Sequence, residues 1–149
     1  MPSAVPTARR WLLDQLTVEF SADDADVAFP HPTREAPASV VLTGYLDTAE
    51  EWAAIGAGRR TETFELQVLI VVARPSTGDP FEVEDLVLGY ADRVTAVVMA
   101  DITMGGAVYN SIVAGRSGLG DDNIAVAAVE GGGYGGQIDV RIACQARIT

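Results

Sequence analysis

The sequence contains no lysine, one histidine and one cysteine, and no apolar run near the roughly 18 residues that a membrane-spanning helix needs. A single cysteine excludes an internal disulfide framework. The first residues also lack the basic, apolar and small-residue order of a signal peptide. We therefore expect a soluble protein that has no membrane partner and is not classically secreted.

Acidic residues outnumber basic ones. The 149 residues include 21 Asp and Glu against ten Arg, so the formal net charge is −11. This charge repels phosphates and argues against an electrostatic nucleic-acid binder. Hydrophobic residues make up 48% of the chain, which is typical of a folded protein. Length and composition together predict a single domain over residues 1–149.

Hydrophobic periodicity predicts two helices and several strands. Apolar residues recur at helical spacing over residues 8–20, with Thr7 as the expected N-cap. Asp79 and Glu82 have the spacing of a capping box, which predicts a second helix over residues 80–100. Alternating apolar and polar residues predict strands over residues 39–46, 60–74, 107–116, 124–130 and 137–148.

The order of these elements lacks the alternation of a doubly wound fold. It predicts an α+β domain in which an antiparallel or mixed β-sheet of about four to five strands carries two α-helices on one face. Residues 21–38 show no sustained period and are expected to form a connection. Three further segments are predicted outside the helices and strands: an N-terminal arm over 1–6, a long inter-strand loop over 47–59 and a glycine-rich hairpin tip over 131–136.

The sequence offers few residues for catalysis. His31 lies between two prolines in the irregular segment, where a solvated loop residue is the simpler interpretation than a general base. Cys144 falls on the apolar side of an alternating run, which indicates a core thiol. The glycines of residues 131–136 are followed by no Lys-Ser/Thr and no helix, so they do not form a phosphate loop. We predict no catalytic residue, no metal site and no cofactor.

Several residues in the predicted loops are candidates for protein contacts. Trp52 either folds back on the core or docks into another protein. Tyr134 is either part of a flexible tip or an aromatic contact to a neighbouring subunit. The neighbouring charges either form a solvated run or make complementary contacts across a head-to-tail interface. The candidate interface residues are therefore Glu50, Glu51, Trp52, Arg59, Arg60 and Tyr134.

Three stretches carry a resemblance to a known family. They are Trp11-Leu12-Leu13 in the first helix, the alternating strand that begins at Glu62, and Asp101 to Val108 after the second helix. Within the last stretch, a glycine pair tolerates a tight redirection of the backbone from helix to strand. This junction comprises Thr103, Met104, Gly105 and Gly106. In these stretches and in its order of elements, the chain resembles the tail terminator, or tail completion, proteins of long-tailed phages.

The resemblance implies a structural protein of the virion tail, assembled in the host cytoplasm. Its partners would be copies of itself in a hexameric ring, the tail tube protein and the head-side connector or neck protein. The ring would cap the tube and stop its polymerisation. Two alternatives stay open from the sequence: another neck or head-completion subunit, and a small-molecule-binding regulatory domain of the same fold class.

Overall fold

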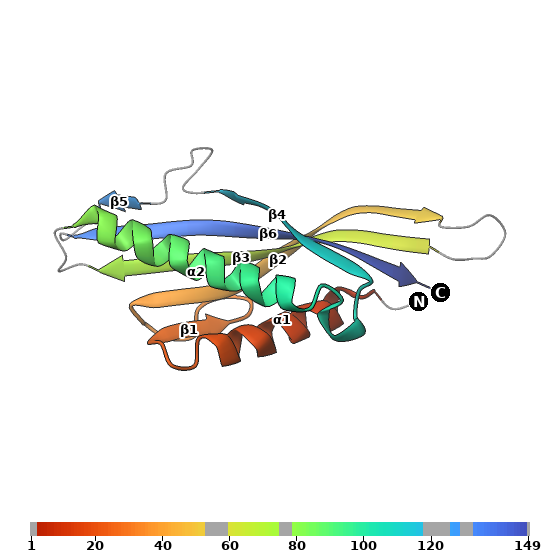
Figure 1. Ribbon diagram of the computed structural model, residues 1–149, viewed down its shortest axis with the longest axis horizontal. Coiled ribbons are helices and arrows are strands. Elements are labelled where there is room, and N and C mark those ends of the chain that lie inside the picture. Colours follow the sequence, from red (N-terminus) through yellow and green to blue (C-terminus); the bar gives the residue numbers. More distant parts are fainter. Residues whose placement is uncertain (1–2, 53–59, 75–78, 118–125, 129–132, 149) are drawn as a thin grey trace.

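A computed structural model of the chain describes residues 3–52, 60–74, 79–117, 126–128 and 133–148. Two helices, six strands and one short 3-10 turn follow each other along the chain (Figure 1). In order they are α1 (Val5–Glu19), β1 (Ala25–Ala28), β2 (Ala38–Trp52), β3 (Arg60–Arg74), α2 (Pro80–Ala100), η1 (Met104–Gly106), β4 (Asn110–Ser117), β5 (Val126–Ala128) and β6 (Tyr134–Ile148). The predicted α+β class is confirmed.

The strands form one open, mixed sheet in the order β1-β2-β3-β6-β4, and the short β5 also pairs with β6. Only β1 and β2 are parallel, whereas every other pair is antiparallel. The centre is the β3–β6 pair, in which Arg60–Arg74 is matched with residues 134–148 without a register shift. These two strands and β2 run along the long axis of the molecule (Figure 1).

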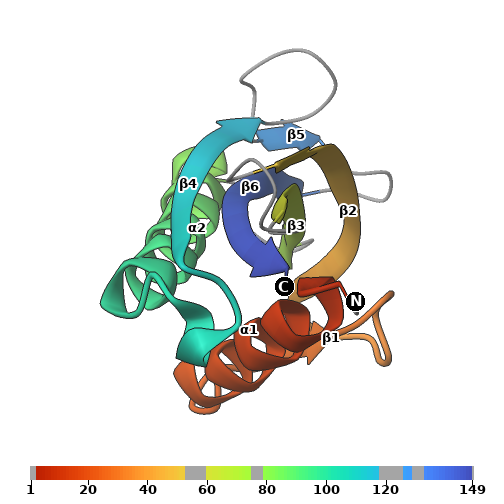
Figure 2. The same ribbon diagram turned by 90° about the vertical axis from the view of Figure 1, so that its right-hand side faces the viewer.

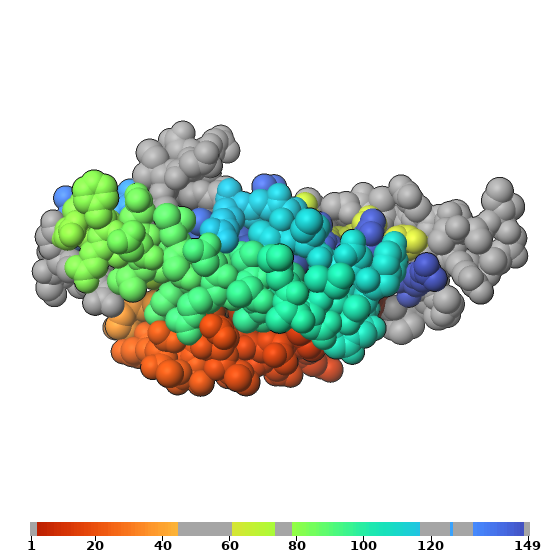
Figure 3. Space-filling model, in the orientation of Figure 1, coloured from red at the N-terminus to blue at the C-terminus, as the bar shows by residue number. Residues whose placement is uncertain are grey.

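One face of the sheet and both helices make the core. On β3 and β6 every second side chain is buried, from Phe64 to Val72 and from Ile138 to Ala146. Both helices lie on this face (Figure 2), and they are packed side by side on the surface shown in Figure 3. Each helix contributes a stripe at three- and four-residue spacing: Val5, Ala8, Leu12, Leu16 and Phe20 from α1, and Val83, Val87, Ala91, Val94 and Val98 from α2.

The first helix begins earlier than the sequence predicts. Helix α1 starts at Val5, which is buried, so the arm predicted over residues 1–6 is wrong from Val5 onward, and Thr7 is not the cap. The N-cap residue is Ala4, whose methyl group accepts no hydrogen bond. Instead Glu62 of β3 accepts from the Ala4 backbone N–H at 2.8 Å and from Ser3 Oγ at 2.6 Å. The acceptor for this helix end thus comes from a distant strand, which local sequence rules do not detect.

Replacing Glu62 by alanine is expected to destabilise the fold by about 1–2 kcal/mol, because the Ala4 N–H at the N-cap of α1 and the Ser3 hydroxyl lose their acceptor. Chemical unfolding followed by circular dichroism measures the change. Glu65→Ala is the matched control, since Glu65 lies on the same strand but on the face away from the helices. Equal losses in the two variants would show that Glu62 does not cap the helix.

Arg93 of α2 joins the two helices. Its guanidinium donates to Glu19 Oε1 at 3.0 Å, to the Glu19 backbone carbonyl at 2.7 Å and to Asp23 Oδ2 at 2.8 Å. It also lies over the Phe20 ring, 4.3 Å from the centroid. The hydrogen bond from Arg93 lowers the pKa of Asp23 below its ordinary value. The C-terminal end of α1 is therefore fixed against the middle of α2.

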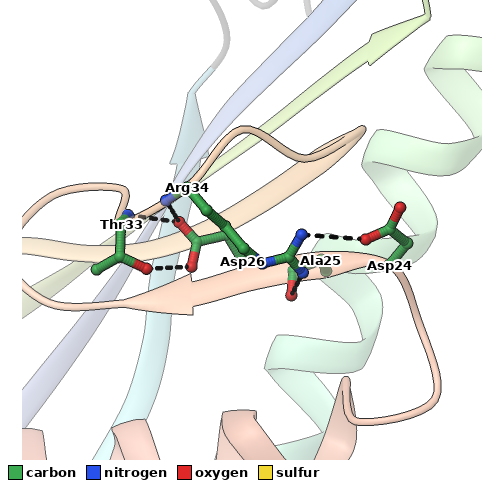
Figure 4. A network of polar contacts seen from close by, with 5 residues as sticks. All are labelled: Asp24, Ala25, Asp26, Thr33 and Arg34. Atoms are coloured by element: carbon green, nitrogen blue, oxygen red, sulfur yellow. Dashed lines mark hydrogen bonds and ion pairs between the residues drawn. The ribbon is translucent and has the colours of Figure 1, made fainter.

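Strand β1 was not expected, since it lies in the segment predicted to be a connection. Asp26 of β1 is buried, and its carboxylate accepts from Thr33 N at 2.6 Å, Thr33 Oγ1 at 2.8 Å and Arg34 N at 3.2 Å (Figure 4). Arg34 in turn donates to Asp24 Oδ1 at 3.2 Å and to the Ala25 carbonyl at 3.3 Å. These bonds fold the connection back on β1 and bring the chain into β2 in the parallel direction.

Candidate assembly interface

The predicted loop over residues 47–59 is wrong for its first half. Strand β2 continues to Trp52, and its last residues pair with β3, Glu50 with Glu62 and Trp52 with Arg60. Two register shifts, at Leu42/Tyr45 and Asp47/Ala49, interrupt the ladder. Asp, Glu and Ala are poor strand formers, which is why the sequence indicates a loop where pairing with β3 imposes a strand.

As a result, the far end of the β2–β3 pair projects beyond both helices (Figure 1). We call the end of this pair, residues 50–52 and 60–61, the arm. Glu50, Glu51 and Trp52 belong to the arm on β2, and Arg60 is its first residue on β3. Arg59 lies outside the described residues. Four of the six candidate contact residues therefore sit together at one end of the molecule, on paired strands rather than on a loop.

Tyr134 does not lie on a hairpin tip. It is the first residue of β6, where it pairs with Arg74 of β3 and Ala128 of β5, and it packs half-buried against the core. Gly135 and Gly136 also belong to this strand, so the predicted tip over 131–136 is wrong for its last three residues. Gly133, with a φ of 79°, precedes the strand, and residues 131 and 132 lie outside the described part. This position separates Tyr134 from the arm, at the other end of β6.

The junction after α2 is held by Asp101. Its carboxylate accepts from Thr103 N at 3.0 Å, Thr103 Oγ1 at 2.6 Å and Gly105 N at 3.0 Å. These hydrogen bonds lower the pKa of Asp101 below its ordinary value. The chain makes the short turn η1 here and continues into β4, where Ser111 Oγ donates to the Ile102 carbonyl at 2.8 Å. The turn thus links α2 to β4.

The same junction contacts the first helix. Met104 is buried, while Gly105 and Gly106 have φ angles of 68° and 92°, a region that favours glycine. A Cβ on Gly105 would lie 2.8 Å from Trp11 Cδ1, whereas one on Gly106 would meet open space. Trp11 of α1 therefore lies directly against the Gly105 backbone, and the stretches that carry the family resemblance, Trp11 and Thr103 to Gly106, are in contact.

A groove with both apolar and polar lining residues lies between the two helices next to this junction. It has a volume of about 380 Å³ and is lined by Trp11, Gln15, Val18, Glu19, Ala96, Val97, Ala100 and Asp101. Val18 is 72% exposed, and Met99, near the end of α2, is 70% exposed. Val18 lines the groove and Met99 does not, and exposed apolar side chains at a groove are typical of protein contact surfaces. The sequence pattern does not indicate this site, because Val18 and Met99 lie off the two predicted helix stripes.

The residues considered for catalysis lie in different surroundings. His31 is exposed, and its Nδ1 lies 3.2 Å from the Pro32 carbonyl oxygen. Cys144 is buried in β6 on the face that the helices cover, and burial raises the pKa of its thiol to about 12. A thiol with such a pKa is a poor nucleophile at neutral pH. The geometry therefore gives these two residues no shared site.

The described residues contain no group of three or more His, Cys, Asp or Glu side chains placed to hold a metal ion. Over the same part of the chain, neither helix has the length and apolar character needed to cross a membrane. Comparison with known proteins finds no family model and no curated protein that matches this chain.

Proposed function

We propose that this protein is a structural assembly subunit of the tail terminator type, which forms a ring with copies of itself and caps the tail tube of a long-tailed phage. The observation that supports this most is the arm, which projects beyond the helix-covered body and carries Glu50, Glu51, Trp52 and Arg60. A projecting hairpin with an aromatic residue and charges of both signs is suited to contact a neighbouring protein.

The groove between the helices supports the same proposal. It offers a second surface, formed by other residues than those of the arm. A ring subunit needs two different surfaces, for its two neighbours or for its neighbour and the tube. A standard interface covers about 800 Å² on each partner, roughly a tenth of the 8269 Å² surface of this chain. Both surfaces therefore fit on one small domain.

The remaining features agree with an assembly role. The junction and Arg93 fix α1, α2 and β4 to one another, so the body provides a rigid support for the arm. The net charge of −11 disfavours binding to DNA phosphates and is compatible with protein partners. In the proposed role the subunit contacts its own copies, the tube protein and the head-side connector, in the virion tail.

A capping assay tests the function. Tail tube protein is allowed to polymerise with and without this protein, and tube lengths are measured by electron microscopy. The proposal predicts shorter tubes with a ring at one end. Tubes of unchanged length and bare ends would contradict it, and binding to the portal-side neck proteins instead would favour the head-completion alternative.

Replacing Val18 by aspartate is expected to weaken capping at least tenfold, because a third carboxylate would have to be buried in the contact beside Glu19 and Asp101, which already line the groove. Its stability should change by less than about 0.5 kcal/mol, since Val18 is 72% exposed. Phe81→Asp is the matched control, because Phe81 is equally exposed at 72% but lies at the opposite end of α2 and away from the groove. Equal effects of the two substitutions in the capping assay would remove the groove from the proposed interface.

A further inference from the structure

The two long edges of the sheet are left open on opposite sides of the molecule. Strand β1 pairs with β2 only over Ala38–Val41, and among the described residues no strand pairs with the outer side of β2 from Leu42 onward. At the other edge β4 pairs with β6 on one side, and the described strands leave its outer side unpaired. Figure 2 shows β2 and β4 on opposite sides of the β3–β6 pair.

The two edges are complementary in direction. Each neighbouring pair along β2-β3-β6-β4 is antiparallel, so β4 runs opposite to β2. If a second copy continues the sheet in the same orientation, its β2 lies beside β4 of the first copy in antiparallel fashion. Head-to-tail addition of this kind uses two different edges, which is the heterologous contact that closes a ring.

The two edges also match in level. Following the register across the sheet, Asn110 is level with Gln145, Thr63 and Ala49. In the same way, Ile112 is level with Ala143, Glu65 and Leu46. Strand β4 therefore lies at the same level along the strand direction as the part of β2 that does not pair with β1. A second copy that joins at this level would not collide with β1.

The residues of β4 favour pairing with a second chain. Natural edge strands are commonly protected by lysine, proline, inward-pointing charges or β-bulges, and of these the two edges have only the register shifts, at Val113/Gly115 in β4 and at Leu42/Tyr45 and Asp47/Ala49 in β2. Strand β4 contains no Lys, Pro or acidic residue, and Ile112 is 62% exposed. Because β4 has no carboxylate, it can approach the uncovered β2 stretch, which contains Asp47 and is followed by Glu50, without placing like charges opposite each other. The register shift at Val113/Gly115 divides β4 into two regularly paired segments, Asn110–Val113 and Gly115–Ser117.

We infer that copies of this chain join edge to edge, with β4 of one copy adding as an antiparallel strand to the uncovered stretch of β2, residues 42–49, in the next. This inference rests on the proposed ring and names the strands that form its subunit contact. The backbone hydrogen bonds supply the attraction, as in other cases of strand addition. The arm then lies next to the start of β4 in the neighbouring copy.

Cysteine cross-linking of the full chain tests the inference. Ile112→Cys and Leu46→Cys are combined in one variant, because the register across the sheet places the two positions at the same level. The native Cys144 is only 1% exposed and remains in place. With a short bismaleimide, the double variant should give a ladder of covalent oligomers on denaturing gels, whereas each single variant should stay at the mass of one chain.

Other outcomes separate the inference from the proposed function. Cross-linked dimers from Ile112→Cys alone would mean that two β4 edges pair with each other, which overturns the inference. A double variant that is folded by circular dichroism and oligomeric by light scattering, yet gives no ladder, would overturn edge pairing and leave the ring proposal intact. A wild-type chain that remains monomeric with the tube protein present would overturn both.

Discussion

Replacing Gly105 by alanine is expected to lower the free energy of unfolding by about 2–4 kcal/mol. Part of this loss is the cost of an L-residue at a φ of 68°, about 1 kcal/mol. The rest comes from the new Cβ, which would lie 2.8 Å from Trp11 Cδ1 and force the indole or the turn to move, at about 1–3 kcal/mol. Denaturant unfolding monitored by circular dichroism measures the change.

Gly106→Ala provides the matched control. Gly106 has a φ of 92°, so alanine is strained there as well, but its Cβ would meet open space. The expected loss is therefore only the conformational part, about 1 kcal/mol. If the two variants lose equal stability, Trp11 is not held against the Gly105 backbone, and the contact between the two stretches does not contribute to the fold.

The second large effect is expected at Asp26. Replacing its carboxylate by the amide of asparagine removes the charge from these three hydrogen bonds and leaves one acceptor oxygen, which keeps the two backbone N–H donors only if the amide N–H₂ group turns toward Thr33 Oγ1; the loss should be about 1–3 kcal/mol. Asp24→Asn is the control, because Asp24 is 70% exposed in its ion pair with Arg34 and should contribute less than about 0.5 kcal/mol. Thermal or chemical unfolding of both variants measures the difference.

Asp26 also makes stability depend on pH. Burial raises the pKa of Asp26, but the hydrogen bonds from Thr33 and Arg34 outweigh it, so the pKa in the folded state lies below the ordinary 3.8. A carboxyl group of this kind stabilises the fold above its unfolded pKa and loses that contribution as pH falls through its folded pKa. Wild-type stability should therefore fall below about pH 4. The Asp26→Asn variant should show a smaller fall, and an identical fall would contradict this assignment.

The elements that the sequence predicts well are those determined by local signals. Strand β3 is observed over Arg60–Arg74 and helix α2 over Pro80–Ala100, with the predicted bounds. Long periodic patterns define both, and Asp79 caps α2 by accepting from Phe81 N at 3.0 Å. In these two elements the local preference and the tertiary packing agree.

The differences arise where a distant residue decides the structure. Helix α1 starts at Val5 because Glu62, far along the chain, supplies its acceptor. Strand β1 exists because Thr33 and Arg34 satisfy the buried Asp26, although the segment has no periodic pattern. The end of β2 is a strand because β3 pairs with it. None of these interactions has a signature within a short window of sequence.

The candidate contact residues show the same difference between what local sequence signals indicate and what tertiary contacts determine. Glu50, Glu51, Trp52 and Arg60 were identified as contact candidates from charge and an aromatic residue, and the structure gathers them on the arm. Their position on paired strands depends on tertiary pairing, as does the placement of Tyr134 away from them. The groove between the helices requires knowledge of how α1 and α2 pack, which the sequence pattern alone does not provide.

The mass of the purified protein in solution tests the central claim most directly. Light scattering over a range of concentrations, with the protein alone and mixed with tail tube protein, distinguishes a closed ring from a monomer of 15.7 kDa. We expect one oligomer of fixed size, six times the mass of the chain, either alone or once the tube protein is added. A monomer at every concentration that ignores the tube protein would contradict the proposed assembly role and favour a ligand-binding domain.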